Sequence, residues 1–242
     1  LNDAFDALGW LASQPVWPQF YWQQRNGDEE AAVLGAVAAF SSLESASNFY
    51  ISMIIIDLRI WGLNAFEPQR GNLLLPRLEW RRCAGVASLR LHLYSDVSLR
   101  EDAAQAIAFI SSLAPVKPLP ALRLNLTGEQ HWPEKAGWID LIKLATQTIA
   151  GEDLDKVVLA RATDLQFSQS VNAAAVMASS RRLNLNCYHS YAFSADTAFL
   201  GSSPERLYRR RDTALRTERW PELWPITLRI IGLAIGRLAN ER

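Results

Sequence analysis

Two side chains in this sequence could take part in acid–base chemistry, because each stands where an apolar run begins or ends. The first is Lys156, which directly precedes the run Val157–Ala160. We interpret this run as a buried strand. A lysine directly before such a strand can be partly desolvated, which lowers the pKa of its amine and suits it to act as a general base. The alternative is an ordinary lysine whose stem packs on the strand while its ammonium group stays in water. Taken alone, the pattern favours the ordinary lysine.

The second side chain is Glu205, which lies in the turn Ser203–Arg206 directly after an apolar, strand-like segment. A carboxyl group held where a strand ends could act as a general acid if burial raised its pKa. The alternative is a surface turn with a solvated Glu–Arg pair, and the segment viewed by itself favours that alternative.

Other motifs for catalysis or metal binding are missing from the sequence. It has no glycine-rich phosphate loop, no closely spaced Cys/His ligand set and no Gly-x-Ser-x-Gly nucleophile elbow. Because His92, His131 and His189 are dispersed, we expect no histidine-based triad. His92 falls on the polar side of an alternating run, so we expect it at the surface. Cys83 and Cys187 are far apart in sequence, which is typical of reduced thiols in a cytosolic protein.

The bulk composition excludes several classes of protein. Of the 242 residues, 49% are hydrophobic and 21% are charged, so the chain can bury a sizeable core and is not intrinsically disordered. Lys plus Arg and Asp plus Glu number 25 each, so no net field favours nucleic acid or an anionic membrane. No apolar stretch approaches the roughly 20 residues of a membrane span, and no signal peptide opens the chain. We therefore expect a cytoplasmic protein that binds neither nucleic acid nor membranes.

Turn signals, helix caps and hydrophobic periodicity place these residues on specific elements. Asn26-Gly27 predicts a hairpin turn, and Ser42, Ser98 and Asn172 predict helix N-termini. We predict strands over residues 20–24, 31–40, 58–64, 72–82, 86–94, 122–127, 157–167, 187–193, 198–202, 207–210 and 214–217. We predict helices before Pro15, over 42–48, over 98–113, over 133–151 and over 172–185. Consecutive strands with helices between the runs favour an α+β fold with antiparallel sheets over a parallel, doubly wound sheet.

A proline-rich connector divides the chain. Pro115, Pro118 and Pro120 form a stiff segment that is the best candidate for a subdomain boundary. We therefore expect an N-terminal α+β subdomain over residues 1–114 and a second part that begins at residue 121.

The strand that contains Lys156 and the turn that contains Glu205 resemble segments of the chorismate-utilising enzymes. Within that family, which includes salicylate synthase and component I of anthranilate synthase, the chain is similar to the menaquinone-specific isochorismate synthases. The similarity runs from about Asp3 to Glu218 and makes residues 121–218 the N-terminal portion of the chorismate-binding catalytic domain. It rests on the segments Phe20–Arg25, Ile60–Asn64, Asp155–Arg161, Phe199–Leu207 and Leu215–Glu218.

The resemblance implies a fold, a reaction and a role for each residue. The fold would be α+β, with layered antiparallel sheets and helices outside them. The reaction would be the Mg²⁺-dependent conversion of chorismate to isochorismate, a small-molecule isomerisation in menaquinone biosynthesis. Lys156 would activate water for attack at C2, and Glu205 would protonate the departing C4 hydroxyl. Related amine-transferring enzymes lack this lysine because ammonia replaces water, so Lys156 favours a hydroxylated product.

The C-terminal segment departs from the family pattern. After Glu218 the family continues with a small-residue Ala-Gly-Thr segment, whereas this chain continues with Arg219–Thr227. One legal set of codons for Arg219–Thr227, read with one G added in front, encodes Ala-Leu-Ala-Gly-Thr-Val-Ala-Asn-Asn. We therefore predict that residues 219–242 are an out-of-frame tail. The segment Tyr50–Ile56, where the family has a polar loop, is either a second, local frame excursion or a true buried strand.

This departure affects the expected activity. In the family, the Mg²⁺-binding glutamates and most groups that bind the chorismate carboxylates lie in a C-terminal half that this sequence lacks. We therefore expect this truncated polypeptide to be inactive or nearly so, and poorly soluble because sheet edges and core are uncovered.

Two alternatives stay open at this point. The chain could be another chorismate enzyme, of the salicylate or anthranilate type. It could also be a non-catalytic fragment that binds a protein partner such as an intact copy. The sequence leaves the oligomeric state open.

Overall fold

An antiparallel sheet forms the centre of the larger part of this protein. The computed structural model describes residues 5–53, 57–65, 67, 69–206, 208–211, 214–216 and 233–235. The chain divides into two compact units: unit 1 contains residues 1–120 and 173–242, and unit 2 contains residues 121–172. The predicted division at residues 1–114, 121–218 and 219–242 stays a prediction, and each unit is described below by itself.

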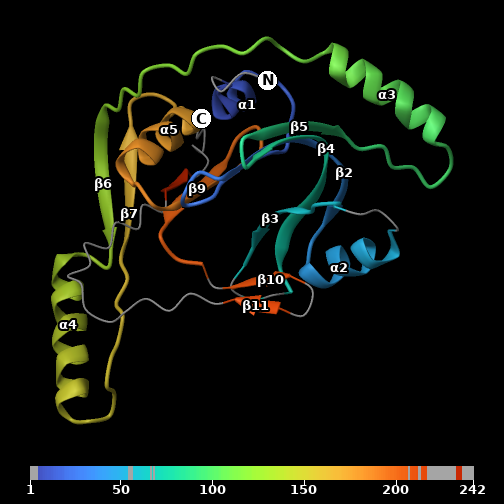
Figure 1. The fold of residues 1–242 in the computed structure, drawn as a ribbon. Helices are drawn as coiled ribbons and strands as arrows, with labels where there is room; N and C mark the ends of the chain where they lie inside the picture. The colour runs from blue at the N-terminus through green and yellow to red at the C-terminus, as the bar shows by residue number, and fades with distance from the viewer. Residues whose placement is uncertain are drawn as a thin grey trace. The chain divides into compact units, whose positions relative to one another are not determined.

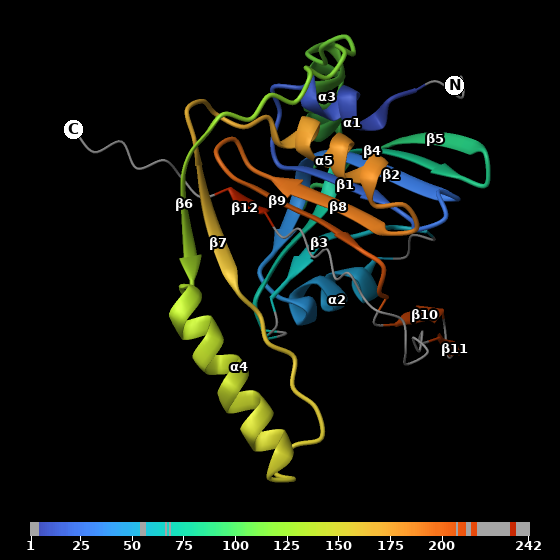
Figure 2. The same cartoon turned by 90° about the vertical axis from the view of Figure 1, so that its left-hand side faces the viewer.

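Within the described residues, unit 1 has one sheet of eight strands, seven of which lie in the order β12-β9-β8-β1-β2-β4-β3 (Figures 1 and 2). β5 also pairs with β4, so β3 and β5 share the edge of β4 that β2 leaves free. The strands are β1 (Gln19–Gln23), β2 (Glu29–Phe40), β3 (Trp61–Asn64), β4 (Gly71–Cys83), β5 (Val86–Leu91), β8 (Tyr188–Phe193), β9 (Ala198–Ser203) and β12 (Leu233–Ile235). A separate two-stranded ribbon consists of β10 (Arg209–Arg211) and β11 (Ala214–Arg216).

The β1–β2 hairpin sets the register at the middle of this sheet. The predicted turn at Asn26-Gly27 is confirmed, and Gly27 has a φ of +76°, which glycine adopts without strain. Phe20 pairs with Val33 and Tyr21 with Ala32, so alternate residues point to opposite faces. β1 also pairs with β8, and β8 pairs with β9, the strand before the Ser-Pro-Glu turn, so that all three lie in the same sheet.

The hydrophobic core of unit 1 lies on the face of the sheet that α1 (Ala7–Ala12) and α5 (Ala173–Leu183) cover (Figure 2). Its largest fully buried side chains include Leu8, Leu11, Tyr21, Leu34, Leu78, Met177 and Leu200. Helix α3 (Leu99–Ser111) packs Phe109 against this core, and α2 (Leu43–Ser52) contacts β2 and β4. The caps of both helices are confirmed, because Ser42 Oγ and Ser98 Oγ each accept a backbone N–H bond from their first turn.

Unit 2 is a helix between two paired strands. β6 (Leu126–Trp132) and β7 (Ala162–Phe167) form an antiparallel pair, and α4 (Lys135–Ala150) connects them (Figure 1). As predicted, α4 ends at Gly151, which is its C-cap residue. None of the residues 121–172, all of which the structure describes, is buried.

The fold class predicted from the sequence, α+β with antiparallel sheets and helices outside, is confirmed. Some local predictions are wrong. The strand predicted over 122–127 begins only at Leu126. His92 is half-buried rather than at the surface, because its ring packs toward β4 with Nδ1 2.9 Å from the Pro76 carbonyl oxygen. That burial lowers the pKa of His92.

Some predictions fall on residues outside the described ranges. The proposed caps Asn2 and Asp3 do so, while the first helix itself is present with Asp6 at its N-cap. In the segment 50–56, Tyr50–Ser52 forms the end of α2 instead of a strand, and 54–56 are not described. Of the predicted tail, only Leu233–Ile235 is described.

Candidate active site

Lys156 lies in the extended segment of unit 2 that connects α4 to β7. The buried strand predicted over Val157–Ala160 is wrong, because β7 starts only at Ala162, which pairs with Trp132. No described strand pairs with residues 157–160, and the side chain of Val158 is 74% exposed. Lys156 is exposed as well.

Glu205 lies in unit 1, directly after the last residues of β9. Its backbone N–H donates to Ser203 Oγ at 3.2 Å, which folds the Ser-Pro-Glu segment into a tight turn. The carboxyl side chain is exposed, so the described residues give it no apolar pocket. The position just after a strand end is thus as predicted.

Arg25, which is far from this turn in the sequence, contacts the backbone of the turn. It follows β1, and its Nη1 donates to the Pro204 carbonyl oxygen at 3.1 Å. The guanidinium group also lies over the Tyr188 ring at 5.6 Å, and Arg206 lies over the same ring at 5.9 Å. Two cations therefore flank the residue that carries the carboxyl group, Glu205. Arg25 lies in the segment Phe20–Arg25 that carries part of the family resemblance, but its contact with this turn appears only in the structure, where β8 and β9 follow β1 in the sheet.

His189 is a buried histidine that sequence reasoning took only as one of three dispersed residues. It is 4% exposed, and its Nδ1 lies 2.8 Å from Ser202 Oγ. Ser202 Oγ in turn lies 2.8 Å from Ser180 Oγ on α5. Burial, with a smaller contribution from Arg181, lowers the pKa of His189 to about 4. The neutral histidine bonds Ser202 Oγ, which in turn bonds Ser180 Oγ, and this chain of contacts ties α5 to the sheet. The alternation of residues along the predicted strand 187–193 is the signal that could have placed His189 inside.

A second buried polar group joins α5 to β1, β2 and β4. Glu30 is 3% exposed and accepts from Tyr21 Oη at 2.7 Å, from Arg82 at 2.6 Å and from Arg181 at 3.1 Å. Arg181 also bonds the Tyr21 hydroxyl directly. Burial, reinforced by the Glu30 carboxylate, raises the pKa of Tyr21 far above its usual range. This network is fully hydrogen-bonded and serves the fold rather than a reaction.

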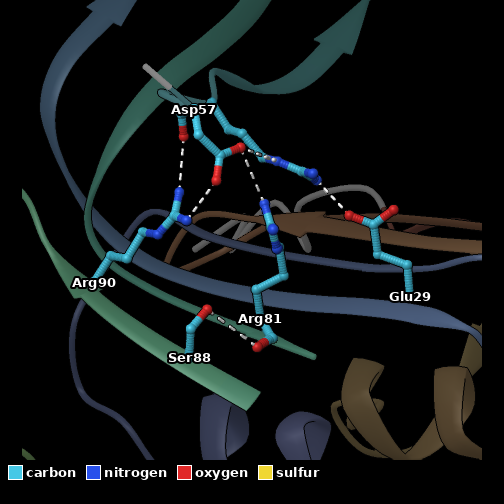
Figure 3. Close-up of polar contacts among 6 residues, drawn as sticks. Glu29, Asp57, Arg81, Ser88 and Arg90 are labelled. Carbon is cyan, nitrogen blue, oxygen red and sulfur yellow. Dashed lines mark hydrogen bonds and ion pairs between the residues drawn. The ribbon is translucent and has the colours of Figure 1, made fainter. Parts of the chain in front are cut away.

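On the opposite face of the sheet, Asp57 is held by arginines from β4 and β5. Figure 3 shows its carboxylate facing Arg81 and Arg90, which it bonds at 3.4 Å and 2.5 Å. These contacts, the Arg90 hydrogen bond above all, lower the pKa of Asp57. Arg59 extends the cluster to Glu29 at 2.5 Å. The cluster fixes the start of the segment that leads into β3 on the sheet.

Glu79 lies close to this cluster and is fully buried, at 0% exposure. Neither of its carboxyl oxygens has a hydrogen-bond partner. Burial raises the pKa of Glu79, and the charges of Arg59, Arg90 and Arg81 oppose that effect only in part. The side chain is therefore a carboxyl group whose neutral form the fold favours.

The described residues hold no group suited to a magnesium ion. Within the described ranges, no three His, Cys, Asp or Glu side chains come together as a metal site would require. Cys83 and Cys187 are both free, in line with the expected reduced thiols. No helix among the described residues has the length and apolarity needed to cross a membrane.

Comparisons with known proteins agree with the resemblance seen in the sequence. The family described as chorismate binding enzyme matches residues 64–219. Isochorismate synthase MenF of Escherichia coli (strain K12) is 68% identical over 220 residues, which make up 90% of this chain and 51% of that protein. MenF of Haemophilus influenzae is 30% identical over 220 residues, 89% of this chain and 49% of that protein. The chain thus spans about half the length of the curated relatives it matches.

The structural comparison leads to the same family. The solved structure of MenF, the menaquinone-specific isochorismate synthase from Escherichia coli, matches this fold with a TM-score of 0.85 at 68% identity. The match covers 90% of this chain and 51% of that one. Lys156 and Glu205 both fall inside the matched range 64–219, which is well over half of the sequence. This chain therefore belongs to the chorismate binding enzyme family.

Proposed function

We propose that this chain contributes the acid–base residues of a menaquinone-specific isochorismate synthase, which interconverts chorismate and isochorismate. The observation that carries the proposal is the 68% identity to E. coli MenF over 90% of the chain, across a range that includes Lys156 and Glu205. The free cysteines suit a cytoplasmic location.

The two residues divide the proton transfers of the reaction. Water attacks C2 of chorismate and gives a proton to the Lys156 amine, while the hydroxyl at C4 departs with a proton from the Glu205 carboxyl group. The ring gains one hydroxyl and loses another, so no oxidant or reductant is needed. The reaction needs a neutral amine and a protonated carboxyl group, and burial of both residues would favour these forms. Because both are exposed in this chain, the proposed mechanism requires a cover over each.

Arg25 is the residue we expect to hold Glu205 in place. Its bond to the Pro204 carbonyl and its position over Tyr188 fix the backbone on which Glu205 stands. A guanidinium group beside the turn also suits a substrate that carries two carboxylates.

Magnesium, which the family resemblance implies, needs ligands beyond the described residues, since these offer no metal-binding group. A chain that lacks this site has little to neutralise a dianionic substrate. We therefore propose that the 242-residue chain alone is inactive or nearly so, and that it works only with the half of the family fold that it does not match.

The test is an assay of the purified chain with chorismate and Mg²⁺, followed by chromatographic identification of the product. We expect no isochorismate from the chain alone, and isochorismate when it is co-expressed with the unmatched half of E. coli MenF. In that complex Lys156→Ala should lower kcat by about 10²- to 10⁴-fold, while Lys143→Ala on α4 should not. Robust isochorismate formation by the chain alone would overturn the inactivity. Detection of anthranilate in the presence of ammonium, or of salicylate, would contradict isochorismate as the product.

The out-of-frame origin of residues 219–242 has its own test. The family match ends at residue 219, where the predicted tail begins, and this agreement supports the proposal. Sequencing the DNA after the Glu218 codon should show an Ala-Gly-Thr reading one base out of frame. A sequence with no such frame would contradict the proposal.

A further inference from the structure

Tyr188 on β8 lies at the centre of the contacts around the Glu205 turn. In the antiparallel register it stands directly opposite Ser203, whose Oγ accepts the Glu205 backbone N–H at 3.2 Å. Residues directly opposite each other on antiparallel strands point to the same face of the sheet. The Tyr188 ring therefore lies on the face of the Ser203 side chain, while the next residue, His189, points into the core on the other face.

Two arginines lie over this ring. Arg25, which follows β1, has its Cζ 5.6 Å from the ring centroid, and Arg206 has its Cζ 5.9 Å from the same centroid. Both distances lie within the roughly 6 Å over which the face of an aromatic ring attracts a guanidinium group. All three residues are half-buried, so water screens these contacts less than at an open surface. One ring thus contacts two cations that are far apart in the sequence.

The two arginines hold the residues on either side of Glu205. Before it in the chain, the Pro204 carbonyl oxygen accepts from Arg25 Nη1 at 3.1 Å. After it, Arg206 is held through its guanidinium group on the ring. Because the backbone is held on both sides, the region that the Glu205 carboxyl group can reach is limited, and a fixed position is what an acid needs in order to protonate one atom of a substrate.

Trp22 of β1 holds the ring itself. Its indole stacks on the Tyr188 ring with centroids 6.3 Å apart and planes at 26°. Trp22 in turn packs against a small buried cluster of Phe20, Val33 and Leu74. Packing of this kind restricts the rotamers of a side chain, so the ring offers a fixed surface to the two arginines. The position of the turn is therefore referred to the middle of the sheet, where β1, β8 and β9 lie side by side (Figure 2).

We propose that Tyr188 is a positioning residue for Glu205, because its ring fixes the two arginines that hold the backbone on either side of that residue. The role of the carboxyl group as an acid rests on the proposed function, while the placement of the turn rests on these contacts alone. The contacts use the face of the ring, so phenylalanine should replace this tyrosine. Leucine, which has no aromatic face, should release both arginines and let the turn move.

The first experiment measures hydrogen exchange by mass spectrometry in a peptide of the 242-residue chain that contains residues 203–206. Tyr188→Leu should raise the exchange rate there about 5- to 30-fold, as expected for the loss of two cation–π contacts. Tyr188→Phe should exchange like the parent chain. Tyr50→Leu, the same change at a 45% exposed tyrosine on α2, is the matched control and should leave this rate unchanged. If Tyr188→Leu does not fold, Arg206→Gln removes one of the two cations and should raise the rate about 2- to 5-fold.

The second experiment measures kinetics in the co-expressed assay of the proposed function. Tyr188→Leu should lower kcat about 10- to 100-fold and change KM by less than about 3-fold, because a displaced acid weakens the transition state more than substrate binding. Tyr188→Phe should restore kcat. A general loss of folded protein would instead lower the active fraction in step with the urea midpoint, which is measured for each variant.

The outcomes separate this role from the proposed reaction. Faster exchange and a lower kcat in Tyr188→Leu, both restored in Tyr188→Phe, support the proposal. Faster exchange with an unchanged kcat overturns it, as does equal loosening in Tyr188→Phe. Unchanged exchange in both Tyr188→Leu and Arg206→Gln overturns it whether or not the parent is active. If the parent assay yields no isochorismate, the proposed function fails, and the exchange rates alone decide whether Tyr188 holds the turn.

Discussion

The two units of this chain use similar sequence patterns with opposite results. In unit 1, alternating strands and amphipathic helices enclose buried residues such as Leu78, which is 1% exposed. In unit 2, an equally amphipathic helix and alternating strands enclose none. The difference shows that a pattern specifies an element, while burial depends on how many layers are present to pack against it.

The largest contrast should come from removing a buried charge. Glu30→Ala leaves Arg82 and Arg181 without their carboxylate in unit 1 and should lower the free energy of unfolding by about 3–5 kcal/mol. The matched change in unit 2 is Glu129→Ala, which removes an exposed pair between Glu129 Oε1 and His131 Nε2 at 3.6 Å. It should change the free energy of unfolding by less than about 1 kcal/mol. Urea unfolding followed by tryptophan fluorescence measures both. Equal effects would mean that the units do not differ as described.

Core truncation should give nearly as large a contrast. Leu78→Ala opens a cavity between the sheet and its helices and should destabilise unit 1 by about 2–5 kcal/mol. Leu144→Ala on α4, where the leucine is 60% exposed, should stay within about 0.5 kcal/mol of the parent chain. If Leu144→Ala lowered the free energy of unfolding by about 2 kcal/mol or more, measured with heat or urea, this face of α4 would be covered and the two units would not differ in burial as described.

Acid should weaken unit 1 through His189. Because folding lowers the pKa of this histidine from 6.5 to about 4, the unfolded chain takes up a proton first as the pH falls. The stabilising contribution is fully present above about pH 6.5 and is lost progressively toward about pH 4, by up to about 3 kcal/mol. The difference in unfolding free energy between parent and His189→Gln, measured across this window, should therefore shrink as the pH falls. A difference that does not vary with pH would refute this role for His189.

The smallest contrast concerns helix caps. Ser42→Ala removes the bond from the Ser45 N–H and should destabilise α2 by about 1 kcal/mol. Helix α4 begins at Glu134, whose side chain makes no cap bond, so Glu134→Ala should cost only a few tenths of a kcal/mol. Circular dichroism and urea midpoints of the two variants measure the difference. A larger loss in Glu134→Ala would indicate a contact that unit 2 makes elsewhere.

Local signals in the sequence predicted most of the elements. The Asn26-Gly27 turn, the serine caps and the end of α4 at Gly151 each depend on residues within one or two turns of chain, and each is confirmed. The strand predicted over Val157–Ala160 failed for a different reason. An apolar, β-branched run has the propensity for a strand, but a strand forms only when another strand pairs with it.

The roles of Lys156 and Glu205 stay predictions, and the sequence did not show what surrounds them. Lys156 and Glu205 were found from their motifs, and the match to the chorismate binding enzyme family over residues 64–219 includes both. Arg25 was missed as a partner of the Glu205 turn because the two are separated by 179 residues along the chain. The pairing of β1 with β8 and of β8 with β9 brings them together.

By itself, the sequence determined the type and order of most elements, the family and the two residues that could exchange protons. These depend on local spacing and residue type. The tertiary structure alone decided that His189 and Glu30 are buried, that Glu79 lies without a hydrogen-bond partner and that Lys156 is exposed. Burial depends on segments far apart in sequence that cover a side chain, and in His189 and Glu79 burial is the largest cause of the shifted pKa.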